Sequence, residues 1–423
     1  MSFTDTIVAQ SSGRPPAAIA VVRTSGPAAR AAAEALSGPL PEARQAAVRR
    51  LIDPRDGALI DQAVLLRFDA PHSSTGEDVV EYQCHGGRAT IEALIGALLC
   101  QPGFRLADPG EFTRRALANG RIDLTEAEGL ADLLAAETEL QRRSAMTRAG
   151  GALRKRLDDW RERLLELGAR AEVAIDYADE EDGAADAELQ PDIASLSAEM
   201  EELVDAPRVE AMRDGIRVVV AGPPNAGKSS LVNALAQGEK AIVTHIAGTT
   251  RDVIEVPIAL DGVPFVLVDT AGLRDSDDVV ETIGIARARG EAERADLLLW
   301  LGPEDPPAHA GLIRIAAKAD LGCDRPGLPV SAMTGEGLGE LSRQLIEQAH
   351  GLLPAGDQLA LDRRQHGLLA EAQEALERAA MLDDAVLMAE ELRAARQAID
   401  RISGRAGVED LLDALFGRFC LGK

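Results

Sequence analysis

The stretch that decides the fold of one large domain is Ile216-Arg217-Val218-Val219-Val220-Ala221-Gly222-Pro223-Pro224-Asn225-Ala226-Gly227-Lys228-Ser229. A short apolar run leads into Gly-x-x-x-x-Gly-Lys-Ser, the pattern of a phosphate-binding loop between a strand and a helix. The glycines allow backbone N–H groups to surround phosphate oxygens, and the helix N-terminus adds its positive end. In this pattern Lys228 neutralises phosphate charge and the Ser229 hydroxyl binds Mg²⁺. The alternative is an ordinary glycine-rich turn.

Two further motifs follow at the spacing of a GTPase, which argues against the simple turn. Thr249-Thr250-Arg251-Asp252 is typical of a switch loop, in which a Thr completes the Mg²⁺ shell. Leu267-Val268-Asp269-Thr270-Ala271-Gly272 predicts a strand that ends in an acidic residue able to hold the water shell of Mg²⁺. Gly272 would then approach the γ-phosphate. The three motifs in this order predict a nucleoside triphosphatase of the GTPase type.

The base-reading motif of GTPases is usually Asn-Lys-x-Asp, and here it reads Ala317-Lys318-Ala319-Asp320. Asp320 can accept hydrogen bonds from the ring N–H and the exocyclic amine of guanine, which excludes adenine. Ala317 cannot supply the usual Asn contact. Because a lost hydrogen bond costs about 1 kcal/mol, we expect weaker guanine binding with the preference retained. Ser331-Ala332-Met333 stands in the place of the last base-contacting loop, and the short, proline-containing interval 300–318 indicates a trimmed side of the domain.

The glutamine that orients the attacking water in small GTPases is absent from its usual place. These proteins carry a Gln after Asp-x-x-Gly, whereas Leu273 occupies that place here. Asn225 and backbone carbonyls of the run 241–249 could instead hold a K⁺ ion beside the phosphates. An arginine finger in that position is worth roughly 10³ to 10⁵ in rate. Glu281 could orient the water or its neighbours, and a solvated loop carboxylate is the alternative for this residue.

Composition limits the remaining possibilities. A chain of 423 residues is too long for one core and predicts two to four domains. A net charge of −25 argues against a protein that coats nucleic acid through its overall field. Four scattered cysteines without a Cys-x-x-Cys pattern fit a reducing cytosol and no structural zinc. The sequence also shows no signal-peptide pattern and no apolar run near the roughly 18 residues that span a bilayer.

Residues 1–118 predict a small α/β or α+β domain. The expected strands are 18–22, 62–68 and 79–84, and the expected helices are 27–36 and 88–99. The adjacent residues Cys84 and His85 could form a metal site or a nucleophile pair. Neighbouring side chains on a strand point to opposite faces, which makes joint action of the pair unfavourable.

Residues 119–213 and the end of the chain look helical. Thr125 with Glu128 predicts a capping box that opens a helix with Leu130, Leu133 and Leu134 on its apolar face, ended by Gly150-Gly151. A seam with steps of four and three follows, formed by Leu153, Leu157, Trp160, Leu164, Leu167 and Ala171. The basic residues among them form either a solvated helix face or a tRNA-binding stripe: Arg154, Lys155, Arg156, Arg161 and Arg163. Residues 176–188 predict an acidic surface loop.

A second helical region supplies the other half of a bundle. Its apolar positions are Leu368, Leu369, Leu382, Leu387, Leu392, Ile399 and Ile402, followed by an amphipathic stretch 408–419. Because insertion is tolerated where the chain ends lie close together, we predict one helical domain, 119–213 with 353–423, that carries an inserted nucleotide domain, 214–352. The expected fold class is therefore multidomain: an N-terminal α/β domain, a discontinuous helical bundle and an inserted Ras-like P-loop GTPase domain.

Motifs along nearly the whole chain resemble the family of tRNA modification GTPases called MnmE or TrmE. They are 5–10 (Asp-Thr-Ile-Val-Ala-Gln), 75–78 (Thr-Gly-Glu-Asp), 85–87 (His-Gly-Gly), 110–113 (Gly-Glu-Phe-Thr), the Asn-bearing phosphate loop, 248–252 (Gly-Thr-Thr-Arg-Asp), 269–274 (Asp-Thr-Ala-Gly-Leu-Arg) and 420–423 (Cys-Leu-Gly-Lys). The last usually reads Cys-Ile-Gly-Lys in the family, and Ala317 is the clearest departure.

The resemblance implies a cytoplasmic homodimer, joined through N-terminal domains that bind 5-formyl- or methylene-tetrahydrofolate. By position, the folate contacts would be Arg23, Glu81, Arg121 and Lys423. It implies K⁺-stimulated GTP hydrolysis, with Mg²⁺ at Ser229 and Thr250. K⁺ would be bound by Asn225, Thr244, Ile246 and Thr249. The partner would be MnmG, which brings FAD and NADH and forms a heterotetramer; together they modify C5 of the wobble uridine of certain tRNAs.

The residues expected to carry the chemistry fall into two sets. The catalytic set is Glu281, Asn225, Lys228 and Thr250. The GTP-binding set is Asn225, Ala226, Gly227, Lys228, Ser229, Ser230, Thr244, His245, Ile246, Ala247, Gly248, Thr249, Thr250, Asp269, Thr270, Ala271, Gly272, Lys318, Asp320, Ser331, Ala332 and Met333. Two other hypotheses stay open: a ribosome-assembly GTPase switch, and a folate-binding protein whose nucleotide domain has decayed. Cys420 is either a redox participant or a packing residue.

Overall fold

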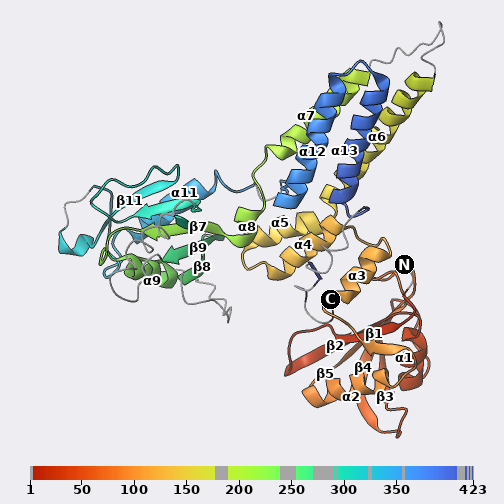
Figure 1. Cartoon of the computed structure of the whole chain (residues 1–423). Coiled ribbons are helices and arrows are strands. Elements are labelled where there is room, and N and C mark those ends of the chain that lie inside the picture. Colours follow the sequence, from red (N-terminus) through yellow and green to blue (C-terminus); the bar gives the residue numbers. More distant parts are fainter. Residues whose placement is uncertain are drawn as a thin grey trace, which may run out of the picture. The chain divides into compact units, whose positions relative to one another are not determined.

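The computed structural model describes residues 3–176, 189–238, 254–269, 290–291, 294–322, 326–354, 358–406, 415–416, 419 and 422. Contacts divide the chain into two compact units, residues 1–131 with 400–423 and residues 132–399. Figure 1 follows the chain through its elements. Among the helices of these described ranges, none combines the length and apolar character that a membrane span requires.

The first unit contains a six-stranded sheet in the order β3-β4-β5-β2-β1-β6. All neighbours are antiparallel except β1 and β6, which run parallel. The strands are β1 (Thr6–Gln10), β2 (Ala17–Ser25), β3 (Ala47–Ile52), β4 (Leu59–Phe68), β5 (Val79–Gly86) and β6 (Phe104–Leu106). Helices α1 (Ala29–Ser37) and α2 (Arg88–Leu99) pack on one face, where their Ala and Leu side chains join strand residues in a common core. Cys84 is buried in this core and His85 is exposed, as strand alternation predicts.

The sequence does not predict three strands of this sheet, because each lacks a clear pattern of apolar residues. β1 is short and flanked by polar residues, β3 interrupts its apolar alternation with Arg49 and Arg50, and β6 is only three residues long. β1 is also covered on the other face of the sheet. There Phe112 of α3 (Glu111–Ala118) packs with Ile7, Ala9 and Ala107.

The expected single helix up to Gly150-Gly151 is wrong. The structure has two helices, α4 (Leu124–Ala135) and α5 (Glu139–Ala149). A capping box at Thr138 starts the second helix: its hydroxyl accepts from the Gln141 N–H, and the Gln141 side chain accepts from the Thr138 N–H. Such reciprocal capping satisfies two otherwise unpaired donors and favours a new helix start.

The predicted cap of α4 is also wrong, and its predicted apolar face holds only in part, because Leu130 and Leu133 are half-buried and Leu134 is exposed. Asp123 is the cap, because its carboxylate accepts from the Glu126 N–H and the Glu126 carboxylate accepts from the Asp123 N–H. Thr125 lies inside the helix and donates to Asp123. The start therefore moves two residues earlier, and Leu124 and Ala127 are buried while Leu134 is 47% exposed.

The helical bundle consists of α6 (Ala152–Asp176), α7 (Leu189–Val204), α12 (Arg363–Ala380) and α13 (Ala385–Ile402), which lie side by side in Figure 1. Every residue of the predicted α6 seam is buried. In α13, Leu392 and Ile399 are buried as predicted, but Leu387 is 54% exposed, and the adjacent Met388 and Ala389 are buried instead. Arg154, Arg156 and Arg163 pair with carboxylates of α6 and α7, which fits a solvated helix face. The tRNA-binding alternative stays a hypothesis.

The chain enters and leaves the nucleotide domain at neighbouring points. The N–H of Val209 donates to the Leu361 carbonyl at 3.1 Å, and the N–H of Arg363 donates to Glu210 at 2.6 Å. Val209 directly precedes α8 (Glu210–Asp214), which leads to the first strand of the domain. Adjacent entry and exit points are what a domain inserted into a bundle requires.

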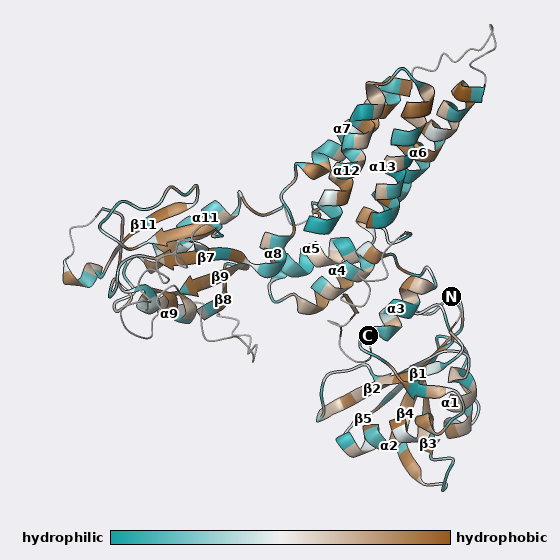
Figure 2. Cartoon of the chain, viewed as in Figure 1, coloured by the Kyte–Doolittle hydropathy of each residue, from teal (hydrophilic) through white to brown (hydrophobic). Residues whose placement is uncertain are grey.

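The nucleotide domain has a second six-stranded sheet, in the order β12-β11-β10-β7-β9-β8. All pairs are parallel except β8 with β9. The strands are β7 (Ile216–Ala221), β8 (Ile254–Leu260), β9 (Val263–Asp269), β10 (Leu297–Trp300), β11 (Leu312–Ala317) and β12 (Leu328–Val330), and the helices include α9 (Lys228–Gly238) and α11 (Leu338–Ala349). The hydropathy colouring of Figure 2 shows how apolar β7, β9 and β11 are, as expected for central strands covered on both faces.

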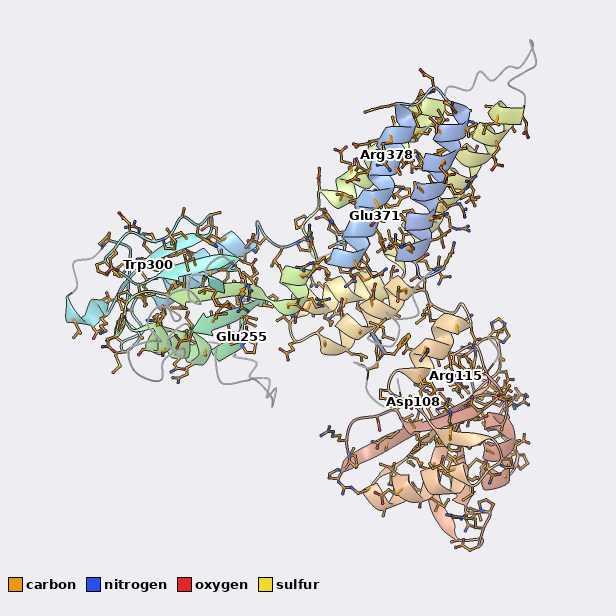
Figure 3. All side chains as sticks on the ribbon, viewed as in Figure 1. Asp108, Arg115, Glu255, Trp300, Glu371 and Arg378 are labelled. Carbon is orange, nitrogen blue, oxygen red and sulfur yellow. The ribbon has the colours of Figure 1, made fainter. Side chains whose placement is uncertain are left out.

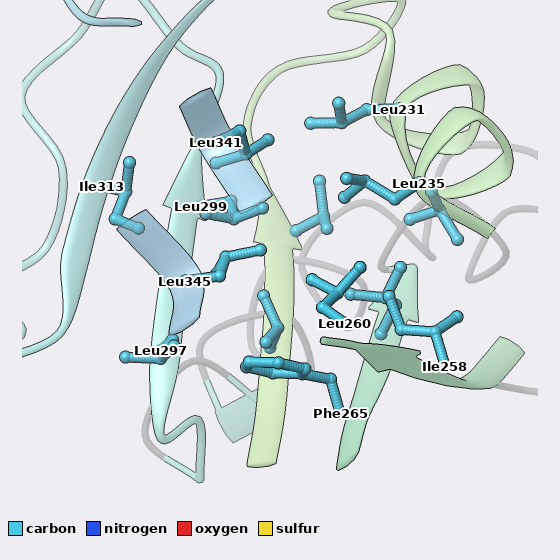
Figure 4. Close-up of a cluster of buried hydrophobic side chains, with 14 of the residues drawn as sticks. Leu231, Leu235, Ile258, Leu260, Phe265, Leu297, Leu299, Ile313, Leu341 and Leu345 are labelled. Carbon is cyan, nitrogen blue, oxygen red and sulfur yellow. The ribbon is translucent and has the colours of Figure 1, made fainter. Parts of the chain in front are cut away.

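The core of this domain joins α9 and α11 to the sheet. Figure 4 shows Leu231 and Leu235 of α9 and Leu341 and Leu345 of α11 around the buried strand residues Ile258, Leu260, Phe265, Leu297, Leu299 and Ile313. The connection from β10 to β11, residues 301–311, contains no helix, which confirms the expected trimmed side. Trp300 takes part in closing it: its Nε1 donates to the Glu304 carbonyl at 3.0 Å, and a Cβ on Gly302 would come within 2.9 Å of its ring.

Candidate nucleotide site

The candidate site lies at the carboxyl end of β7, where the chain continues into α9. β7 pairs with β9 on one side and with β10 on the other, so the connections leave it in two directions. In open parallel sheets, ligands bind in the crevice outside such a switch point. The phosphate loop, residues 222–227, occupies this position.

The backbone of the phosphate loop takes conformations that its sequence permits. Gly222, Asn225 and Gly227 have φ values of 146°, 60° and 103°. Glycine adopts positive φ without steric cost, and Asn tolerates the left-handed region better than most residues. A Cβ at Gly222 would also lie 3.2 Å from the backbone of residues 301–302, so the loop packs closely against the end of β10.

Lys228 is held over this loop. It is 7% exposed, and its ammonium donates to the carbonyl oxygens of Gly222 and Pro223, each at 2.9 Å. These contacts fix the cation at the N-terminus of α9, where the helix dipole also favours anions. The loop geometry and the fixed cation thus suit a phosphate group.

The groups expected at Mg²⁺ and K⁺ are only partly described. Asn225 and Ser229 are exposed at the loop and the start of α9. Asp269, 3% exposed, ends β9 and is in register with Val220, just before the loop. These oxygen and amide groups suit hard cations. The other predicted residues of this region lie outside the described ranges: Thr244, His245, Ile246, Ala247, Gly248, Thr249, Thr250, Thr270, Ala271, Gly272 and Glu281.

A cavity of about 190 Å³ opens next to the phosphate loop. Its lining residues are Gly227, Ser230, Leu231, Ile315, Ala317, Lys318, Asp320, Leu321, Val330, Ala332 and Met333. Asp320 is oriented by the hydroxyl of Ser331, which is fully buried and donates to Oδ1 at 2.6 Å. Lys318 adopts a left-handed conformation, and its ammonium donates to the Asn225 carbonyl at 2.8 Å. The residues predicted to read the base therefore lie next to the phosphate loop, at one site.

In the first unit, two of the predicted folate residues meet directly. Arg23 and Glu81 are register partners on β2 and β5, and Arg23 donates to Oε1 of Glu81 from Nε at 2.9 Å and from Nη2 at 2.8 Å. The Arg23 guanidinium also lies 5.7 Å from the centre of the Phe112 ring. Arg121 is exposed beside Gly76, where an added Cβ would be 3.2 Å from its Cγ. Lys423 lies outside the described residues.

The sequence prediction missed a buried charge network close to these residues. Arg115 of α3, labelled in Figure 3, is fully buried and donates to Asp5, Glu77 and Glu111. Arg105 makes further hydrogen bonds to Asp5 and Glu111. Burial alone would raise the pKa of the Glu111 carboxyl, but hydrogen bonds from Arg105, the Asp108 N–H and Arg115 outweigh it and lower the pKa. The only sequence signal is the spacing of four between Glu111 and Arg115 on one helix face.

The phosphate loop follows the first strand of a parallel sheet that has one antiparallel edge strand. A cavity that bears a carboxylate lies at the same end of the sheet. Together these features define a P-loop GTPase domain. Two family models match the chain, the MnmE helical domain over residues 124–420 and the GTP-binding protein TrmE N-terminus over residues 6–121.

Similar proteins extend along the full chain. A tRNA modification GTPase MnmE of Novosphingobium aromaticivorans is 53% identical and covers 100% of both chains. One of Erythrobacter litoralis is 54% identical over 99% of this chain and 100% of its own. Among solved structures, the G domain of the T. maritima FeoB iron transporter matches 32% of this chain and 98% of its own, with 25% identity and a TM-score of 0.23. The chain belongs to the MnmE family of tRNA modification GTPases, and it is a GTP hydrolase.

Proposed function

We propose that this protein uses K⁺-stimulated GTP hydrolysis to drive modification of C5 of the wobble uridine in certain tRNAs. The group added is aminomethyl or carboxymethylaminomethyl, its one-carbon unit comes from a tetrahydrofolate, and the FAD-dependent protein MnmG is the partner. The observation that carries the proposal is similarity over the whole chain, N-terminal domain included, to proteins named as tRNA modification GTPases. A ribosome-assembly switch would not account for the N-terminal domain.

The nucleotide domain supplies binding and charge. Lys228 and the N–H groups at the start of α9 hold the phosphates, and Ser229, Thr250 and Asp269 serve Mg²⁺ and its water shell. Asp320 selects guanine. The fixed position of the Lys228 ammonium and the buried carboxylate of Asp269 support these roles.

K⁺ would supply positive charge next to the transferred phosphoryl group. Asn225, Thr244, Ile246 and Thr249 are the residues proposed to hold it, and Glu281 is proposed to orient the attacking water. Support comes from Asn225, which stands exposed in the phosphate loop with φ of 60°, and from Leu273 at the place of the usual Gln. An amide oxygen at this point of the loop suits a hard monovalent cation.

The N-terminal domain, residues 1–118, is proposed to bind the folate and to form the homodimer. Arg23, Glu81, Arg121 and Lys423 would be the contacts. A folate carries a glutamate tail and a pteridine with donors and acceptors, so an arginine and a carboxylate are suitable recognition groups. The Arg23–Glu81 pair places both groups on one face of neighbouring strands. We further propose a heterotetramer with MnmG and a cytoplasmic location.

The proposal is tested by complementation. In a strain that lacks the gene, wobble uridines should lose the C5 group, as measured by mass spectrometry of digested tRNA. The wild-type gene should restore it, and an Asn225→Ala gene should not. A matched control is Asn233→Ala, an exposed Asn on α9 outside the phosphate loop, which should restore it fully. Wobble uridines that stay fully modified in the deletion strain would favour a GTPase with another task.

A further inference from the structure

The base cavity differs from the usual pattern at its deep wall. Ala317, the last residue of β11, is 7% exposed and lines the cavity. It is in register with Val330 of β12, so its backbone is fixed in the sheet. Ile315, Val330 and Ala332 line the same cavity, which makes this wall apolar.

Side-chain donors and acceptors in the cavity are few. Among the described lining residues, only Ser230, Lys318 and Asp320 carry polar side chains. The Lys318 ammonium donates to the Asn225 carbonyl, and Ser230 is in the first turn of α9, at the phosphate end. Asp320 supplies the carboxylate of the described lining, and Ser331 holds it in place.

These groups match one edge of guanine and leave another unmatched. The ring N–H and the exocyclic amine are donors and suit the Asp320 carboxylate. The edge that carries O6 and N7 has two acceptors and needs donors. An Asn at position 317 would offer an amide N–H₂ there, whereas the Ala317 methyl offers none.

We propose that residue 317 decides whether the protein makes a hydrogen bond to N7 of the purine. With Ala317 there is no such bond, and guanine is selected through Asp320. The site then takes guanine nucleotides and their 7-deaza analogues equally well. It still rejects adenine, because adenine has no ring N–H for Asp320. Among the described lining side chains, selectivity then rests on the carboxylate of Asp320, and N7 is not read.

Binding of GDP and 7-deaza-GDP to the full chain tests this by calorimetry or competition with a fluorescent nucleotide. For the wild type the two dissociation constants should agree within about twofold. For Ala317→Asn, GDP should bind about fivefold more tightly, the affinity equivalent of one neutral hydrogen bond, and 7-deaza-GDP should not improve. A wild type that binds 7-deaza-GDP fivefold or more weakly than GDP overturns the proposal, since N7 would then be read by another group.

The Ala317→Asn variant shows whether recognition of N7 depends on residue 317 or on other groups of the cavity. If Ala317→Asn binds both nucleotides like the wild type, position 317 does not set the reading of N7 and the proposal fails. If the variant does not fold, the wild-type ratio still decides whether N7 is read. A control variant, Asp320→Asn, should lose GDP affinity at least tenfold and gain affinity for xanthosine diphosphate, whose 2-oxo group accepts from the new amide. Unchanged GDP binding by that variant would also overturn the proposal.

These measurements need no K⁺, folate, tRNA or partner. A failure of the proposed tRNA chemistry would leave them unchanged, and their failure would leave that chemistry standing.

Discussion

Arg115 illustrates how one side chain can organise the edge of a domain. It is fully buried and hydrogen-bonds three carboxylates from three segments: Asp5 before β1, Glu77 in the loop before β5 and Glu111 at the start of α3. Its guanidinium also lies 4.4 Å from the centre of the Phe3 ring. A planar guanidinium with five donors is suited to such multiple pairing.

Replacement of Arg115 by Met should therefore be strongly destabilising. The change removes the cation paired with Glu77 and leaves Asp5 and Glu111 with Arg105 alone. Loss of one partner from a buried ion pair typically costs 3–5 kcal/mol. The loss should appear in calorimetry as a lower transition temperature of the unit that contains it. Arg114→Met, at an exposed position of the same helix, should change stability by less than about 0.5 kcal/mol. Equal effects of the two changes would contradict the role assigned to the network.

The same network predicts how stability depends on pH. The pKa of Glu111 is lowered in the folded protein, so its ionised form contributes stability above its unfolded pKa, near 4.3, and this contribution is lost as pH falls through the folded pKa. Wild type should be more stable than Glu111→Gln at pH 7, and the difference should shrink below about pH 4, where the protonated carboxyl resembles the amide. Thermal melts of both proteins from pH 3 to 7 measure this. A difference that stays constant or grows on acidification would contradict it.

At the residue scale, motifs with a defined chemistry could be predicted from the sequence, and the buried network could not. The phosphate loop, Asp320 and Ser331 carry fixed spacings, and the structure brings Lys228, Lys318 and Asp320 to one end of the sheet. Arg115 pairs with Asp5, a residue 110 positions earlier. No local pattern reports a partner at that separation.

At the scale of elements, the α4–α5 boundary depends on one cap. The sequence 124–149 has helix-forming residues throughout, but the reciprocal hydrogen bonds of Thr138 and Gln141 begin a new helix. The Gln141 side chain also donates to the Arg213 carbonyl at 3.1 Å, which connects this turn to α8. Local propensity predicted helical structure correctly, and the Thr138-x-x-Gln141 capping box, a local signal that the prediction missed, decides where the helix breaks.

Thr138→Ala should accordingly destabilise α5. Loss of a capping hydroxyl typically costs about 1 kcal/mol, with a range of about 0.5–2. Hydrogen exchange of the first-turn amides of α5 should become correspondingly faster, and Thr138→Ser should restore most of the protection. Thr147→Ala removes the same hydroxyl from a half-buried position of the same helix, where it donates to the Arg143 carbonyl and caps no helix end, and should alter exchange of these amides little. Faster exchange only in the Thr147 variant would show that the cap has been placed wrongly.

For the molecule as a whole, the nucleotide domain is an insertion. Entry and exit are joined by the Val209–Leu361 and Glu210–Arg363 hydrogen bonds, while the phosphate loop and base cavity lie between residues 222 and 333. Two helical regions that each look like half a bundle predicted this arrangement, because insertion is tolerated where the chain ends lie close together. The missed strands β1, β3 and β6 are short or polar and are held by their neighbours in the sheet.

A fragment of residues 207–363 should thus fold and bind GDP on its own. Its affinity should be within about twofold of that of the full chain, because every described residue lining the base cavity is included. Calorimetric titration of both proteins measures this. Affinity lowered tenfold or more in a folded fragment would mean that segments outside the domain complete the site.

The central claim is that Asn225 in the phosphate loop holds a monovalent cation that replaces the missing glutamine and arginine. The most direct measurement is the rate of GTP hydrolysis in K⁺ and in Na⁺ for the wild type, Asn225→Ala and Asn233→Ala. We predict hydrolysis at least tenfold faster in K⁺ than in Na⁺ for the wild type and Asn233→Ala, and loss of that difference in Asn225→Ala with GDP binding retained. Equal wild-type rates in the two salts, or full K⁺ stimulation without Asn225, would contradict the claim.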